Sequence, residues 1–225
     1  MRLGALNRVG VSWWALFAGI LLLLPGCFGR KLQGGKHAYE IYADGDIDPE
    51  WSDWSFGYLD KKKGQSYQQG NSTMNSRKAY CIDIQQQYGA ASFAAMKKIA
   101  IDNSTMLDIS LRRNGTLEGP RDELSRLQLV LEGVSKDISF MTDPISMLEI
   151  IGDGPGSEDI VEKFFNGEYV ELSINARDLI QGMPPDGQVD FSQISIGSCL
   201  TQDPTCLSSK KDSIISFCIG AISLV

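Results

Sequence analysis

Alternation of apolar and polar residues is the dominant pattern along this chain from Ala38 onward. A period of two is typical of strands that bury one side and expose the other. The clearest alternating runs cover residues 80–84, 107–112, 127–132, 170–174 and 194–196, and a β-rich segment covers residues 214–225. Each run predicts one half-buried strand.

Turn-forming residues separate these strands, and long helical patterns are missing between them. Only residues 157–165 and 176–181 could form helical turns. Many short strands without intervening long helices are typical of sandwiches and barrels, and they argue against a βαβ fold. The prediction from the pattern is a single all-β domain of antiparallel strands, a sandwich or a barrel, over residues 38–225.

The first 29 residues differ from the rest. Arg2 and Arg8 precede an apolar run over residues 11–24, which Pro25 ends, and small residues stand before a cut after Gly29. This order is typical of a secretory signal peptide, and the run is short for a membrane span. The alternatives are an uncleaved signal-anchor and a bacterial lipoprotein, since residues 24–27 (LPGC) resemble a lipobox. Residues 30–37 are expected to form a linker, and no membrane span is expected after cleavage.

Two further features fit export to the cell wall or matrix. Asn71, Asn103 and Asn114 each begin an N-glycosylation sequon. Cleavage after Gly29 removes Cys27 and leaves four cysteines, an even number that suggests two disulfides in an oxidising compartment. Three connectivities are possible. We favour Cys199–Cys206, which closes a short loop, together with Cys81–Cys218, which joins two strands; four free thiols are the alternative.

Charge and composition exclude several classes of function. The 225 residues are 43% hydrophobic and carry a net charge of −7, with a single histidine. An acidic chain lacks the basic face that nucleic acids or anionic membranes require. One histidine argues against histidine-rich metal sites and against Ser-His-Asp or Cys-His catalysis. The 28 acidic residues contain no pattern that selects a catalytic pair, so no enzymatic activity is expected.

Aromatic residues concentrate in residues 51–58 (WSDWSFGY). Strand alternation would place Trp54, Phe56 and Tyr58 on one face, with Trp51 at the entry turn. Aromatic faces pack against the C–H faces of sugar rings, while carboxylates and amides bond the hydroxyls. We expect Trp51, Trp54, Tyr58 and Tyr88 to form a carbohydrate-binding platform, with Asp53 as a polar contact. The alternative is that these aromatics fill the core of the sandwich, although Tyr88, which follows three glutamines, is expected to be exposed.

The same stretch carries a family resemblance. Residues 40–44 (EIYAD), followed by residues 51–56 (WSDWSF), resemble the opening "vYdD" and "gWqDWSW" segments of a family of secreted jelly-roll domains. Residues 77–84, 87–93, 165–174 and 217–225 resemble the later strands of that family in the expected order. These domains are similar to carbohydrate-binding modules of β-sandwich type. The resemblance implies a jelly roll over the whole of residues 38–225 that binds polysaccharide.

The chain departs from the family at two points. Residues 194–198 (ISIGS) replace an aromatic pair of the penultimate strand, so part of the sugar platform is missing. Gly220 and Ala221 replace an acidic pair that helps to hold calcium in related sandwiches. Residues 44–48 (DGDID) alternate carboxylates but do not follow the EF-hand pattern. No metal and no cofactor are therefore expected; a structural calcium at residues 44–48 is the less supported alternative to a solvated acidic turn.

These observations lead to one preferred function and two alternatives. The preferred one is a secreted glycoprotein that binds a cell-wall or matrix glycan without catalysis. The first alternative is a structural or adhesive matrix protein that has lost sugar binding. The second is a small polysaccharide lyase or glycoside hydrolase.

Overall fold

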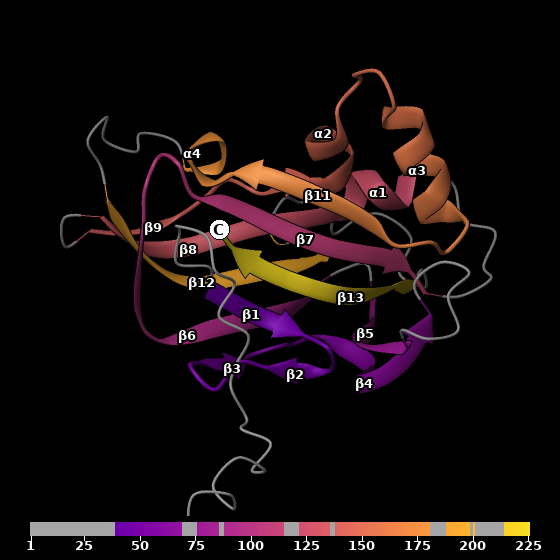
Figure 1. Cartoon of the computed structure of the whole chain (residues 1–225), viewed down its shortest axis with the longest axis horizontal. Coiled ribbons are helices and arrows are strands. Elements are labelled where there is room, and N and C mark those ends of the chain that lie inside the picture. Colours follow the sequence, from indigo (N-terminus) through magenta and orange to yellow (C-terminus); the bar gives the residue numbers. More distant parts are fainter. Residues whose placement is uncertain are drawn as a thin grey trace, which may run out of the picture. The chain divides into compact units, whose positions relative to one another are not determined.

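The computed structural model of the chain is drawn in Figure 1. The structure describes residues 39–68, 76–85, 88–114, 122–135, 138–180, 188–198, 200 and 214–225. The predicted signal peptide and linker, Asn71, Cys199 and Cys206 lie outside the described residues. The description below concerns the single compact unit to which the described residues belong.

Two antiparallel sheets face each other, as the alternating sequence predicts. Sheet A has seven strands in the order β11-β7-β13-β1-β2, with β5 also paired to β13 and β4 paired to β5. Its strands are β1 (Tyr39–Ala43), β2 (Asp46–Ile47), β4 (Tyr58–Gln68), β5 (Ser76–Gln85), β7 (Met106–Arg113), β11 (Val170–Asn175) and β13 (Ile214–Leu224). The strand β13 is central, since it pairs with β7 on one side and with β1 and β5 on the other.

Sheet B has six strands in the order β10-β8-β12-β6-β3, with β9 also paired to β8. Its strands are β3 (Trp51–Asp53), β6 (Gly89–Ile101), β8 (Leu127–Ser135), β9 (Ile138–Met141), β10 (Ile145–Ser146) and β12 (Val189–Ser198). Every pairing with a given register is antiparallel. The all-β sandwich prediction is confirmed, and the alternating runs coincide with β5, β7, β8, β11, β12 and β13.

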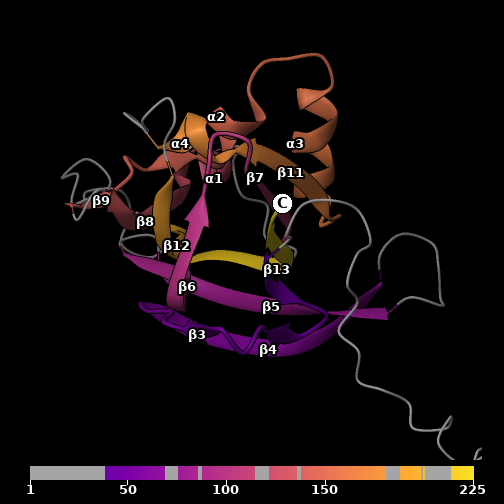
Figure 2. The ribbon, with the colours of Figure 1, turned by 60° about the vertical axis from the view of Figure 1, so that its left-hand side comes forward.

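Short helices cover one side of the sandwich. They are α1 (Asp122–Arg126), α2 (Met147–Ile151), α3 (Ser157–Phe165) and α4 (Ala176–Leu179). Figure 1 shows α1, α2 and α3 gathered beside β11, and the turned view in Figure 2 shows the same grouping. The helical turn expected at residues 157–165 is confirmed, and the one expected at residues 176–181 is confirmed over Ala176–Leu179. Helices α1 and α2 were missed, because five-residue helices contain too few turns to create a visible period in the sequence.

A capping box explains why α2 forms despite its length. Ser146 accepts a hydrogen bond from the Glu149 backbone N–H, and the Glu149 carboxylate accepts one from the Ser146 backbone N–H. Two of the free N–H groups at the helix start are thereby satisfied. The bonds that the Glu149 carboxylate accepts from the Ser146 backbone N–H and from the Ser146 hydroxyl lower the pKa of Glu149.

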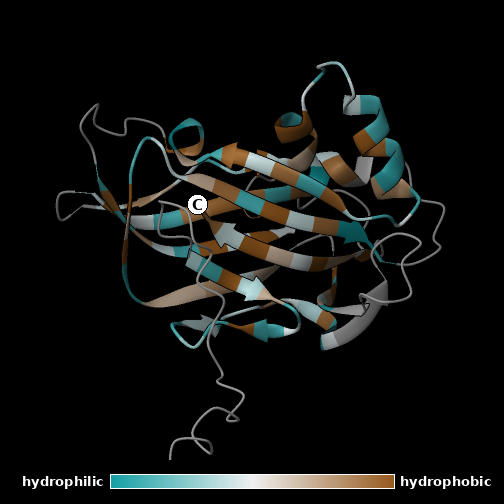
Figure 3. Ribbon diagram, viewed as in Figure 1, coloured by the Kyte–Doolittle hydropathy of each residue, from teal (hydrophilic) through white to brown (hydrophobic). Residues whose placement is uncertain are grey.

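The core lies between the sheets and continues beneath the helices. Its largest fully buried side chains include Tyr42, Tyr80, Phe93, Phe191 and Phe217. Figure 3 shows hydrophobic and hydrophilic bands alternating along β7 and β11. The helices add apolar groups from the side, among them Val161 and Phe164 of α3. No helix among the described residues has both the length and the apolar character that crossing a membrane requires.

The disulfide expected between Cys81 and Cys218 is present. The two cysteines are directly opposite each other on β5 and β13. They form a small buried cluster with Ala79, separate from the main core, against which Tyr169 packs. Residues 81 and 218 point away from Tyr80 and Phe217, which face the core, so the bridge lies on the outer side of sheet A.

Candidate functional site

The outer side of sheet B carries three rows of side chains that run across the strands. The side chains of Phe93, Leu129, Leu131, Ile194 and Ile196 face the core, so their neighbours along each strand face outward. The strand register then defines the rows as Ser52–Ala94–Gln193–Glu132, Trp54–Ser92–Ser195–Val130 and Phe56–Ala90–Gly197–Gln128. We call these twelve residues, together with Tyr88, the sheet B face.

Aromatic rings stand at one edge of this face. The Trp54 side chain is 63% exposed and Tyr88 is 56% exposed. Phe56 is half-buried, and its ring centroid lies 4.9 Å from that of Tyr88. Two backbone bonds between Phe56 and Ala90, and a third from the Trp54 N–H to the Ser92 carbonyl, attach this segment to β6. The exposure predicted for Tyr88 is confirmed.

Two glycines allow this close attachment. Gly57 has φ of +63°, and a Cβ there would lie 2.1 Å from the Tyr88 carbonyl oxygen. A Cβ on Gly89 would lie 2.8 Å from the Gly57 carbonyl oxygen. The chain can therefore pass close to the start of β6 only because both positions lack a side chain. This approach brings Phe56 against Tyr88.

Polar groups occupy the middle of the face. The hydroxyls of Ser92 and Ser195 are 2.9 Å apart and buried. The Gln193 side-chain amide donates to Ser92 Oγ at 2.9 Å and lies 3.5 Å from Ser195 Oγ, so the two serines fix its position. This arrangement leaves the Gln193 carbonyl oxygen available to a ligand. Gln128 accepts a hydrogen bond from the Leu200 backbone N–H at the third row.

Glu132 stands opposite Gln193 and is half-buried. Burial raises the pKa of its carboxyl above the ordinary value. Among the described residues, no lysine or arginine forms an ion pair with it. A half-buried carboxylate beside a fixed amide can accept hydrogen bonds from a ligand that carries hydroxyls.

Trp51 was expected on the platform, and the structure corrects this expectation. Its side chain is 4% exposed and packs against Phe191 of the core, with ring centroids 5.7 Å apart. The reason is the strand period: Trp51 lies opposite Ala95 and faces inward, whereas Ser52 and Trp54 face outward. For Trp51 the alternative interpretation as a core residue was the right one.

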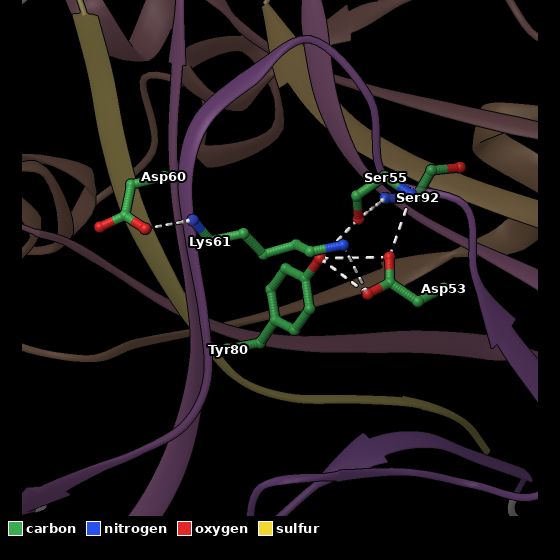
Figure 4. A network of polar contacts seen from close by, with 6 residues as sticks. All are labelled: Asp53, Ser55, Asp60, Lys61, Tyr80 and Ser92. Carbon is green, nitrogen blue, oxygen red and sulfur yellow. Dashed lines mark hydrogen bonds and ion pairs between the residues drawn. The ribbon is translucent and has the colours of Figure 1, made fainter.

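Asp53 was expected to contact sugar, but its side chain points into the edge between the two sheets. Figure 4 shows it among Ser55, Lys61, Tyr80 and Ser92. Its carboxylate accepts hydrogen bonds from the Tyr80 hydroxyl at 3.2 Å, the Ser55 backbone N–H at 3.0 Å and the Lys61 ammonium at 3.1 Å. Ser55 Oγ lies 2.6 Å from the Tyr80 hydroxyl and accepts from the Ser92 N–H at 3.2 Å.

This network shifts the titration of two of its members. Burial works to raise the pKa of Asp53, but hydrogen bonds from Ser55 and Lys61 and the Lys61 charge outweigh it and hold that pKa below the usual value. Burial raises the pKa of Tyr80, and the Asp53 charge adds to this effect. Asp53 is therefore an ionised acceptor in a polar cluster that joins sheet B to sheet A.

Tyr58 is separate from the aromatic edge of the sheet B face. It begins β4 of sheet A opposite Ile84, and the Lys61 ammonium lies 4.6 Å from its ring centroid. The expected single strand through Trp54, Phe56 and Tyr58 is interrupted at Gly57, where φ is positive. The chain leaves one sheet and enters the other at this point, so Tyr58 does not continue the row.

The outer side of sheet A differs in character. Its acids lie opposite serines: Ser173 donates to Asp108 at 2.5 Å and Ser110 to Glu171 at 2.7 Å. Ser216 likewise donates to Asp83. No tryptophan is found among its described side chains. The sheet B face is therefore the better candidate for a binding surface.

Sequence reasoning missed Glu132, Gln193, Ser92 and Ser195 as members of the site. The alternation in residues 127–132 does indicate that Glu132 lies on the polar side of a strand. Nothing in the sequence indicates that this side is shared with Trp54, because the strands that carry them are more than 70 residues apart.

The remaining predicted residues lie away from this face. Asn103 follows β6 in the turn to β7, and Asn114 directly follows β7; both are half-buried. Their glycosylation stays a prediction. No group of three or more metal-ligating side chains occurs in the described part of the chain.

Comparisons with known proteins give structural likenesses only. No family model matches the chain, and no curated protein matches it. A family 29 carbohydrate-binding module from Piromyces equi is 10% identical, with a TM-score of 0.41 over 84% of this chain and 89% of that chain. A family 30 carbohydrate-binding module is 11% identical, with a TM-score of 0.42 over 87% of this chain and 89% of that chain.

A third solved structure, the family 30 module of the cellulosomal cellulase Cel9D-Cel44B of Clostridium thermocellum, is 9% identical. Its TM-score is 0.39 over 84% of this chain and 98% of that chain. All three TM-scores are below 0.5, so we base the function on the geometry of the sheet B face instead.

Proposed function

We propose that this chain is a secreted protein that binds carbohydrate on the sheet B face without catalysis. One observation carries the proposal: the exposed Trp54 ring and the Phe56–Tyr88 pair stand at the edge of a sheet that presents Gln193 and Glu132 on the same side, two and three strands away. A sugar needs flat apolar groups for its ring faces and hydrogen-bonding groups for its hydroxyls, and this side of the sheet carries both.

The chemistry of sugars matches each part of this surface. A pyranose ring has C–H groups on its faces and hydroxyls around its rim. The C–H faces pack on indole and phenol rings, because both surfaces are apolar and flat. The hydroxyls can donate to the Glu132 carboxylate and to the Gln193 carbonyl oxygen. Gln193 is held by Ser92, so it does not have to be ordered when the ligand binds.

The dimensions of the face favour a chain of sugars over a single sugar. The rows cross four strands, β3 and its continuation, β6, β12 and β8. Neighbouring strands are about 4.8 Å apart, so the rows extend over about 14 Å. Ser52, Gln193 and Glu132 of the first row are partly exposed, whereas most of the second row is buried, so the first row is the one that can accommodate linked sugar rings. The ligand we propose is therefore a polysaccharide of the cell wall or matrix.

Export is part of the proposal. It is supported by the leader-like residues 1–29 and by the three sequons. The Cys81–Cys218 bridge also supports it, because disulfides persist mainly in oxidising compartments.

Affinity electrophoresis in gels that contain soluble polysaccharides tests the binding proposal. We expect retardation of the wild type by at least one glycan of a panel of neutral and acidic polymers. Trp54→Ala should abolish most of that retardation, because aromatic stacking is the main apolar contact. Leu148→Ala is the matched control, since Leu148 is 40% exposed but lies on α2, away from the face. Equal migration in every gel would overturn the proposal.

Two outcomes would favour the other functions. Release of reducing ends or of unsaturated products from a retarding glycan would indicate an enzyme. Absence of binding together with adhesion of the intact chain to matrix would indicate a structural protein.

A further inference from the structure

We infer that Tyr80, with Asp53 and Ser55, is a positioning group that holds Trp54 in the orientation needed for sugar stacking. This inference rests on the proposed function. It assigns a role to residues that do not belong to the sheet B face: Tyr80 is a core residue of sheet A.

The first step in the argument is the fixed position of Tyr80. The side chain is fully buried on the inner side of β5. Its ring makes edge contacts with Tyr42 and Phe93, at centroid distances of 5.9 Å and 5.4 Å. Close packing of this kind leaves the ring little freedom. Its hydroxyl is therefore a fixed point at the edge between the sheets.

The second step is that this hydroxyl is bonded to both neighbours of Trp54. It donates to the Asp53 carboxylate, whose two oxygens both lie at 3.2 Å, and it is 2.6 Å from Ser55 Oγ. Lys61 adds an ion pair to Asp53 from β4 at 3.1 Å. Asp53 and Ser55 are thus both drawn inward, toward the same atom, as Figure 4 shows.

The third step follows from strand geometry. Successive side chains of an extended segment point to opposite sides. When residues 53 and 55 are fixed inward, residue 54 has to point outward. The Trp54 N–H also donates to the Ser92 carbonyl at 2.9 Å, so its backbone is attached to β6 as well. The side of the sheet on which the indole stands is therefore set by bonds of its two neighbours and of its own backbone.

The bonds of residues 53 and 55 affect binding, because a mobile Trp54 indole would have to be ordered when the sugar binds. Ordering a mobile side chain costs affinity, and a surface that is already ordered avoids this cost. Loss of the Tyr80 hydroxyl should therefore weaken glycan binding although the hydroxyl never meets the glycan. Removing one net hydrogen bond predicts a loss of affinity of about two- to tenfold.

The test compares Tyr80→Phe with Tyr42→Phe. Both changes remove one buried hydroxyl from sheet A, but the Tyr42 hydroxyl donates to the Lys78 carbonyl and touches neither Asp53 nor Ser55. Affinity for the retarding glycan is measured for each.

Motion of the indoles is measured in the free protein by fluorine NMR relaxation after 5-fluorotryptophan labelling, with the Trp54 signal identified by its loss in Trp54→Phe. Buried Trp51 provides an internal reference.

We expect Tyr80→Phe to increase the motion of Trp54, to leave Trp51 unchanged and to lower affinity, whereas Tyr42→Phe alters neither motion nor affinity. Unchanged Trp54 motion in Tyr80→Phe would overturn the inference, even if affinity fell. If Tyr80→Phe does not fold, Ser55→Ala removes the same link from a half-buried position and decides the question.

The two proposals fail in different ways. A wild type that binds no glycan would overturn the proposed function alone, and the NMR comparison would still decide whether Tyr80 positions Trp54. A wild type that binds glycan, with Trp54 equally mobile in all variants, would overturn only the positioning role.

Discussion

Glu132 of β8 lies directly opposite Gln193 of β12, so a half-buried carboxylate and an amide held by Ser92 share one row on the outer side of sheet B. Residues 132 and 193 are distant in sequence, and only the antiparallel register brings them together. They share this side of the sheet with Trp54, which stands two and three strands away, and this combination distinguishes the face from the serine-rich outer side of sheet A.

Replacing Glu132 by alanine should weaken glycan binding. The carboxylate is the strongest hydrogen-bond acceptor on the face, and bonds to charged groups contribute about 1.5–3 kcal/mol. A loss of affinity of at least about tenfold is expected by isothermal titration with the glycan that retards the wild type. Glu158→Ala, on α3, is the control and should bind like the wild type. Undiminished binding by Glu132→Ala would remove this residue from the site.

The same carboxylate should make stability depend on pH. Burial raises its pKa in the folded state, so ionisation of Glu132 costs the folded state stability as the pH rises. Glu132→Gln cannot ionise. The two proteins should be equally stable below about pH 4, near the ordinary glutamate pKa, and the variant should be more stable at pH 7. Urea unfolding at both pH values gives the free energy of unfolding of each protein. A variant less stable than the wild type at pH 7 would contradict the prediction.

Removing the Cys81–Cys218 bridge should destabilise the fold without altering the site. The bridge joins residues 137 apart in sequence and lies on the outer side of sheet A. Closing so long a loop restricts the unfolded chain and contributes about 3–5 kcal/mol. The double variant Cys81→Ser, Cys218→Ser should show this loss in chemical unfolding. Its glycan affinity at low temperature should match the wild type, and a large affinity loss would indicate coupling between the two faces.

Gly57→Ala should disturb the aromatic edge. The new Cβ would meet the Tyr88 carbonyl, and the positive φ of residue 57 disfavours alanine. A destabilisation above about 1 kcal/mol and weaker glycan binding are expected. Gly64→Ala separates backbone strain from the steric collision. Its φ of +74° gives the same strain, but the nearest other atom is 4.0 Å from the added Cβ, so there is no collision. Gly64→Ala should lose stability and keep its affinity. Equal affinity losses in both variants would contradict a specific role for Gly57.

The sequence by itself was sufficient for the fold class. Alternation along residues 107–112, 127–132 and 170–174 requires strands with one buried side, and such strands are stable only when they pair into sheets that cover one another. For the cysteines the sequence left three connectivities open, and the structure decided that Cys81 pairs with Cys218. The aromatic stretch at residues 51–58 also identified the part of the chain that carries the exposed rings.

The tertiary structure alone decided which of those residues are exposed and which are buried. Trp51 and Trp54 have the same side chain three residues apart, yet one is buried against Phe191 and the other is exposed. Asp53 turned inward because Tyr80 of the other sheet offers it a hydrogen bond. Period and composition describe a strand locally, whereas the choice of outer and inner side depends on strand register and on what the opposite sheet presents. Those are long-range relationships, which a single sequence does not encode in any local pattern.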